Sequence, residues 1–182
     1  MTTTAATFEP SLEALANPDT LLGVDFADPG AMYPDWRGLN YDRSLPVKSI
    51  AAIVRTAVRK AVKAGTLGTA TGVSVRYRSY SGGCSIDATI IVPKVKVTAD
   101  TPGAVEMEDR WGERHWVVKS EGDHSAGIYP NDVIEPGARE AKRKVEALLS
   151  TFNYNRSNSQ VDYFDRNFYS SVDLRDENGG WA

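Results

Sequence analysis

The sequence predicts an α+β fold, a two-layer sandwich in which two helices cover one face of a small, mainly antiparallel sheet. Apolar residues recur at steps of three and four over 46–64 and again over 135–152, as in helices buried on one side. Apolar and polar residues alternate on both sides of a Gly-Gly pair over 73–92, which is typical of a hairpin. A similar alternation over 163–174 predicts a closing strand. The expected order is therefore helix, hairpin, insertion, helix, strand.

The first helix is expected over residues 46–64, with Ser44 as its N-terminal cap and Gly65 at its C-terminal end. Its apolar stripe consists of Val47, Ile50, Val54, Val58 and Ala61. The roughly opposite face carries four basic residues, Lys48, Arg55, Arg59 and Lys63. A helix of this kind packs its apolar stripe on a sheet and leaves its cations accessible.

The hairpin predicts a testable register. If Gly82 and Gly83 form a two-residue loop, the pairs on one side of the ribbon are Tyr77 with Ala88, Val75 with Ile90 and Val73 with Val92. On the other side Arg78 lies opposite Asp87, and Arg76 lies opposite Thr89. A slip of one residue would place the apolar set on the wrong face.

The remaining segments are assigned around this core. Residues 1–46 carry seven acids and two bases among several prolines, and they predict an extended acidic arm. Residues 47–175 form a single α+β domain in which 93–131 is an insertion with a short strand at 115–119. Residues 176–182 are expected to be a flexible tail.

Length and composition exclude several classes of protein. At 182 residues, of which 41% are hydrophobic, the chain has room for one domain with a real core. No apolar run approaches about 18 residues, and the N-terminus lacks the basic and apolar regions of a signal peptide. Cys84 is the single cysteine, which excludes an internal disulfide and fits a reducing compartment. We therefore expect a cytoplasmic protein that does not enter a membrane.

The net charge of −3 hides a strongly basic segment. Residues 47–96 carry nine bases and one acid, a net charge of +8, whereas the segments before and after it are acidic. A basic patch in an acidic chain meets phosphates, an acidic partner or the acidic arm of the same chain.

Catalytic constellations are weak in this sequence. Cys84 would need a positioned base, and both histidines, His115 and His124, fall in the insertion. These histidines lack close ligand spacing with the neighbouring acids Asp109, Glu113 and Asp123.

A Mg²⁺ site built from Asp87, Asp162 and Asp165 is a further possibility, but Asp87 already has Arg78 as its expected partner. No glycine-rich phosphate loop is present. We expect no cofactor, no resident metal and action by binding rather than by catalysis.

The best candidate binding surface combines cations with aromatic rings. It consists of Arg76, Arg78 and Tyr80 on the hairpin, Tyr163, Asn167 and Tyr169 on the closing strand, and the four basic residues of the first helix. Arginines interleaved with tyrosines suit phosphate contacts and base stacking. The alternative is a solvated helix face and a sheet covered by the acidic arm, and Asp87, Asp165 and Asp173 near that face weaken the nucleic-acid interpretation.

Two segments resemble a known family. The run Tyr154-Asn155-Arg156-Ser157-Asn158-Ser159-Gln160-Val161-Asp162-Tyr163-Phe164-Asp165-Arg166-Asn167-Phe168-Tyr169 resembles the C-terminal motif of the large polyvalent protein-associated domain 29 family. The hairpin from Ser74 to Ile86, behind a basic helix, is similar to the family's other hallmark. The matched pieces cover 47–92 and 135–174. The resemblance implies an origin in bacteriophages or mobile elements, whose related proteins are thought to act on the host or its defences. It implies no catalytic residue.

Three hypotheses follow. The first is an accessory protein of a phage or mobile element that binds a host protein or defence complex. The second is a nucleic-acid-binding module that uses the basic helix and the hairpin face. The third is a metal-dependent nuclease. The oligomeric state is not predicted.

Overall fold

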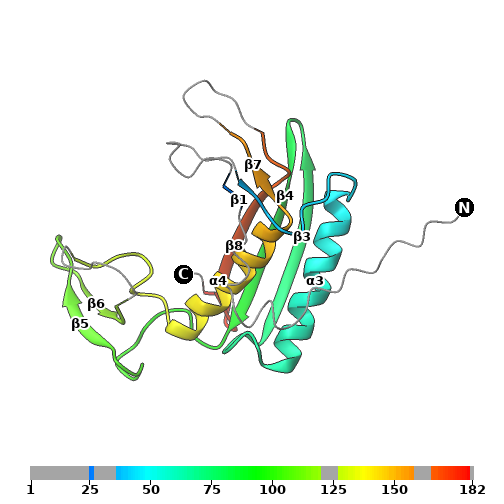
Figure 1. Cartoon of the computed structure of the whole chain (residues 1–182). Coiled ribbons are helices and arrows are strands. Elements are labelled where there is room, and N and C mark those ends of the chain that lie inside the picture. The colour runs from blue at the N-terminus through cyan, green and yellow to red at the C-terminus, as the bar shows by residue number, and fades with distance from the viewer. Residues whose placement is uncertain (1–24, 27–35, 120–126, 158–164, 181–182) are drawn as a thin grey trace, which may run out of the picture.

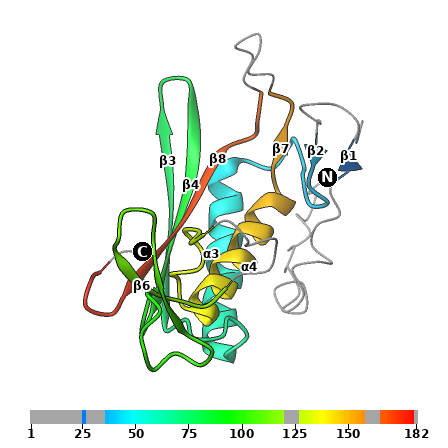
Figure 2. The same cartoon turned by 90° about the vertical axis from the view of Figure 1, so that its left-hand side faces the viewer.

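The computed structural model describes residues 25–26, 36–119, 127–157 and 165–180. Its main sheet has the strand order β3-β4-β8, formed by Gly72–Tyr80, Gly83–Val92 and Tyr169–Asp176. α3 (Val47–Ala64) packs mainly on β3, and α4 (Pro136–Thr151) packs mainly on β8. Both helices lie on one face of this sheet (Figure 1 and Figure 2), which confirms the α+β sandwich.

The strand pairs are antiparallel with one exception among the described strands, the parallel pair of β4 and β8. The parallel pair follows from the chain path, because the insertion and α4 separate the two strands and return the chain to the same end. A second sheet joins β1 (Asp25–Phe26), β2 (Trp36–Arg37) and β7 (Tyr154–Asn155). The insertion contains a hairpin of β5 (Val105–Glu108) and β6 (Arg114–Val117).

The core lies between the helices and the sheet. The apolar stripes of both helices are buried, as the periodicity predicted, and meet alternate residues of the three strands. The fully buried contacts include Val54, Val58, Ile86, Ile90, Leu148 and Leu174. Burial of this apolar surface is the main favourable term in folding. Neither helix covers the opposite face of the sheet.

The hairpin register differs from the prediction by two residues. Val75 pairs with Ala88, Tyr77 with Ile86 and Arg76 with Asp87, because the turn is made by Ser81 and Gly82. Gly82 has a φ of 94°, which residues with a Cβ rarely adopt, and Gly83 already belongs to β4. The predicted pairs were wrong, but the faces were right, since a shift of two residues preserves the alternation.

The helix ends are only partly as predicted. Gly65 ends α3 in the left-handed conformation, as expected. Ser44 does not cap α3, since its backbone N–H and hydroxyl both donate to the Asp42 carboxylate and Pro46 occupies the cap position. The predicted strand at 115–119 is β6. Of the predicted strand at 163–174, residues 163–164 lie outside the described residues, and β8 begins at Tyr169.

The described part of the N-terminal segment packs beside the C-terminal end of α4. The backbone N–H of Gly38 donates to Asn153 O, and that of Asn40 donates to Thr151 O. A Cβ at Gly38 would collide with backbone carbonyl oxygens of α4, so this close approach requires glycine. Residues 36–46 therefore lie on the helix side of the molecule.

The amides behind α4 serve the connection between α4 and β8. The Asn153 side chain, 6% exposed, donates to Phe168 O and accepts from the backbone N–H groups of Tyr154 and Phe168. Asn167 donates to Phe152 O at 3.1 Å, and the Tyr154 hydroxyl donates to Asp165 at 2.6 Å. Side chains that look like a binding cluster in the sequence thus hold the start of β8 in place.

Candidate nucleic-acid interface

The outer side of the main sheet, which we call the open face, carries alternate residues of β3, β4 and β8. A depression of about 440 Å³ lies on it, lined by Ser74, Arg76, Arg78, Asp87, Thr89, Ile91, Ser171, Asp173 and Arg175. Three of these residues are arginines and two are aspartates. Strand alternation places them there, because their sequence neighbours form the core.

A second depression, the basic groove, lies between α3 and the edge strand β3. Its volume is about 600 Å³, and it is lined by Lys48, Ser49, Ala52, Arg55, Arg76, Tyr77 and Arg78. Four of these seven residues are cations and none is an acid. Arg76 and Arg78 line both depressions, so the positive surface continues from the open face around β3 to α3.

Two arginines of the basic groove, Arg55 and Arg78, have partners within the protein. Arg55 donates through Nε and Nη2 to the carbonyl oxygen of Val75, at 3.0 and 2.7 Å, and this fixes its guanidinium beside β3. Arg78 forms an ion pair with Asp87 at 3.0 Å, which confirms the predicted partnership although the two residues are diagonal neighbours. Asp87 also accepts hydrogen bonds from Ser85 and Ser171. The charges of Arg78 and Asp87 therefore compensate each other, whereas the acceptor of Arg55 is a neutral carbonyl oxygen.

Tyrosines lie at the hairpin end of the open face. Tyr80 and Tyr169 are 48% and 38% exposed, and their ring centroids are 6.5 Å apart. The guanidinium of Arg166 lies over the Tyr169 ring at 4.7 Å from its centroid. Partial desolvation and the neighbouring Tyr169 raise the pKa of Tyr80, so this phenol keeps its proton at neutral pH.

The structure places six of the ten predicted binding residues in two groups. Lys48, Arg55, Arg76 and Arg78 line the basic groove, and Tyr80 and Tyr169 lie side by side at the hairpin end of the open face. Arg59 and Lys63 are exposed on α3 but line neither depression. The amide of Asn167 is used within the fold, and Tyr163 lies outside the described residues. Sequence reasoning missed Arg175 and Arg166, although the alternation of β8 placed Arg175 beside Asp173 on the outer side.

The described part of the N-terminal segment does not line the basic groove or the depression on the open face. The alternative in which the arm covers this surface therefore has no support from residues 36–46. Arg76 is exposed.

Other candidate chemistry is weaker. Asp109, Glu113 and His115 offer ligand atoms within 4.8 Å of one another in the β5–β6 hairpin. Asp109 is already bound by the backbone N–H groups of Trp111 and Glu113, and the Glu113 bond is the main cause of its lowered pKa. Burial raises the pKa of Cys84, which makes its thiol a poor nucleophile.

The predicted Mg²⁺ site is also weakened by the structure. Asp165 accepts a hydrogen bond from Tyr154, Asp87 pairs with Arg78, and Asp162 lies outside the described residues. Both described carboxylates are thus engaged with protein groups, whereas a Mg²⁺ site needs oxygen atoms free to bind the ion.

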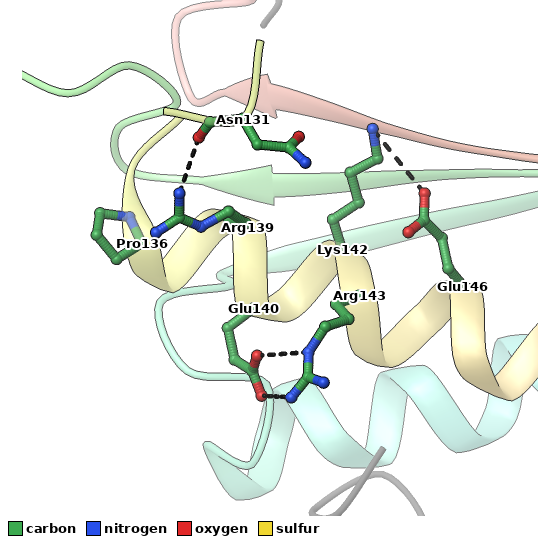
Figure 3. A pocket seen from close by; sticks show the side chains of 7 residues that line it. All are labelled: Asn131, Pro136, Arg139, Glu140, Lys142, Arg143 and Glu146. Carbon is green, nitrogen blue, oxygen red and sulfur yellow. Dashed lines mark hydrogen bonds and ion pairs between the residues drawn. The ribbon is translucent and has the colours of Figure 1, made fainter. Parts of the chain in front are cut away.

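A further depression of about 590 Å³ lies along α4. Its described lining holds three bases and two acids, and two of the bases pair with the two acids. Figure 3 shows Glu140 turned toward Arg143 and Lys142 toward Glu146, with Arg139 on the backbone oxygen of Asn131. Side chains paired in this way attract an anion only weakly. The basic groove therefore remains the better anion site.

Comparison of the chain with protein-family models, with curated proteins and with solved structures gives no match. The resemblance to the large polyvalent protein-associated domain 29 family thus stays a prediction. Neither helix among the described residues has the length and apolar character needed to cross a bilayer.

Proposed function

We propose that this protein binds nucleic acid through the basic groove and the adjoining open face. The observation that carries the proposal is the lining of the groove. Its described residues include four cations and no acid, and Arg76 and Arg78 continue this lining onto an exposed sheet face. Lys48 and Arg76 are both exposed and can reach phosphates directly. Such phosphate contacts supply affinity without sequence preference.

The salt dependence of nucleic-acid binding can be estimated from the four cations of the basic groove. Each neutralised phosphate contributes about 0.7 to 0.9 to the slope of log affinity against log salt, so four contacts predict a slope of about −3. Affinity should then fall by roughly 60-fold between about 50 and 200 mM salt. Removing two arginines should reduce the slope by about 1.5.

The test measures binding of mixed-sequence DNA and RNA oligonucleotides at several salt concentrations. The variant is Arg76→Ala with Arg78→Ala, and Arg76→Ala alone serves as a second variant that keeps the ion pair with Asp87. The control, Lys142→Ala with Arg143→Ala on α4, removes the same charge at two cations that pair with glutamates. Weaker binding with a smaller slope is expected in the groove variants. Absence of binding at low salt, or an equal loss in the α4 control, would reject the proposal.

A second candidate is binding of an acidic segment of a host protein. The family resemblance implies action on the host, and the basic groove suits an acidic partner. The specific observation is that β3 is an edge strand of the main sheet and borders the basic groove. The bond from Arg55 to Val75 O shows that Val75 directs its backbone groups outward, and alternation gives Tyr77 and Ser79 the same direction. An extended acidic peptide can add to such an edge. Retention of a host protein by the wild type but not by Arg76→Ala, together with no oligonucleotide binding, would favour this candidate.

A further inference from the structure

The tyrosine pair at the hairpin tip narrows the kind of nucleic acid that suits this surface. We call Tyr80, Tyr169 and the stacked Arg166 the tyrosine platform. Both rings are substantially exposed on the open face, at the end of the sheet where the β3–β4 hairpin extends past α3 (Figure 1 and Figure 2).

The sheet fixes the positions of both rings. Tyr80 pairs with Gly83, and Tyr169 pairs with Ser85, so the two rings flank β4 on one face. A Cβ at Gly83 would lie 3.4 Å from the Tyr80 ring and 3.6 Å from the Tyr169 ring. The rings therefore lie low over the backbone of Gly83 and are supported from beneath.

The geometry determines how a base can be held. Ring centroids 6.5 Å apart at an interplanar angle of 41° leave too little room for a base between the rings, since two stacking distances need about 7 Å. Arg166 covers one side of Tyr169. A base therefore stacks on the outside of the ring pair, on a ring face that Arg166 does not cover. Within the described part of the chain, neither phenol hydroxyl makes a hydrogen bond, so both stay available to a ligand.

Arginines continue the platform along β3. Arg76, Arg78 and Tyr80 lie on one side of the strand, at steps of about 6.7 Å. A strand of nucleic acid that follows this row meets two guanidinium groups and then a ring. A duplex keeps its base faces inside the helical stack, whereas a single strand can present them to aromatic side chains.

From this arrangement we infer that the nucleic acid bound by this protein is single-stranded, and that its bases stack on Tyr80 and Tyr169. The inference rests on the proposed function and adds the substrate class to it. The competing explanation is that the two rings only shield the backbone of Gly83.

The experiment compares a 15-nucleotide oligothymidine with a duplex of the same length, using fluorescence anisotropy at low salt. The wild type is expected to bind the single strand at least about tenfold more tightly. Tyr80→Leu with Tyr169→Leu keeps apolar cover over Gly83 but removes the stacking rings. It should weaken single-strand binding by about tenfold or more, at an unchanged salt slope because no charge is lost. Tyr80→Phe with Tyr169→Phe keeps the rings and should stay within about threefold of the wild type.

The outcomes separate the two proposals. Equal affinity for duplex and single strand, or full single-strand affinity in the leucine variant, overturns the inference while nucleic-acid binding stands. No binding of either oligonucleotide overturns the proposed function as well. Circular dichroism checks the fold, and Tyr80→Leu alone replaces the double variant if the latter does not fold.

Discussion

Asn153 offers the sharpest test of how the fold positions the open face. Its buried side chain donates to Phe168 O at 2.9 Å and accepts from the backbone N–H of Phe168 at 3.3 Å and of Tyr154 at 2.9 Å. Phe168 is 1% exposed, so water cannot replace the lost partners when Asn153 becomes alanine. Each orphaned buried group costs about 1 to 3 kcal/mol. Asn153→Ala should therefore lower the free energy of unfolding by about 3 kcal/mol.

Urea denaturation followed by circular dichroism measures this change. The midpoint should fall while the slope stays constant, and the melting temperature should drop by roughly 6 to 12 °C for a chain of this size. Asn178→Ala is the matched control, because Asn178 is exposed in the turn after β8 and should cost less than about 0.5 kcal/mol. If Asn153→Ala lowers the free energy of unfolding no more than Asn178→Ala does, the Asn153 side chain does not hold the start of β8 in place.

Three further predictions concern other contacts. The hydrogen bond to Asp165 raises the pKa of Tyr154 to about 12, so folding favours the protonated phenol. Tyr154→Phe should lower the free energy of unfolding by about 1 kcal/mol below pH 10, and this difference from the wild type should disappear as pH rises from about 10 to 12. A constant difference across that range would contradict the hydrogen bond between Tyr154 and Asp165 as its cause. Gly38→Ala should release the packing against the end of α4 and speed hydrogen exchange of residues 36–41, and unchanged exchange would show that the close approach is not required. Asp173→Asn should tighten oligonucleotide binding by about two- to threefold at low salt, because it removes an acid from the open face, while Asp100→Asn in the insertion should not; equal effects would mean that binding responds to net charge alone.

The faces of the sheet were predictable from the sequence because alternation alone assigns them. The strand register was not predictable, since a shift of two residues keeps every side chain on its face. Only the position of the turn distinguishes the two registers. Both Gly82 and Gly83 suit a turn, and the structure uses Ser81 with Gly82. The ion pair of Arg78 with Asp87 survives the shift, because a long arginine side chain reaches a diagonal neighbour.

The candidate site was predictable only where it follows strand or helix periodicity. Arg76, Arg78 and Tyr80 share a parity, and so their common face was evident. That Lys48 and Arg55 approach Arg76 depends on how α3 lies against β3, which no local pattern specifies. The hydrogen bond of the Asn167 amide was not predictable, because its acceptor, Phe152 O, lies 15 positions earlier in the chain.

Amide chemical-shift mapping shows whether nucleic acid binds at the open face and the basic groove or elsewhere on the protein. Titration of the labelled protein with a short single-stranded oligonucleotide should shift the amide signals of residues 76–80 and 169–175 most strongly, with smaller changes in the first half of α3. Signals that move only on α4 or on the β5–β6 hairpin, or that do not move at all, would show that the open face and the basic groove do not bind nucleic acid.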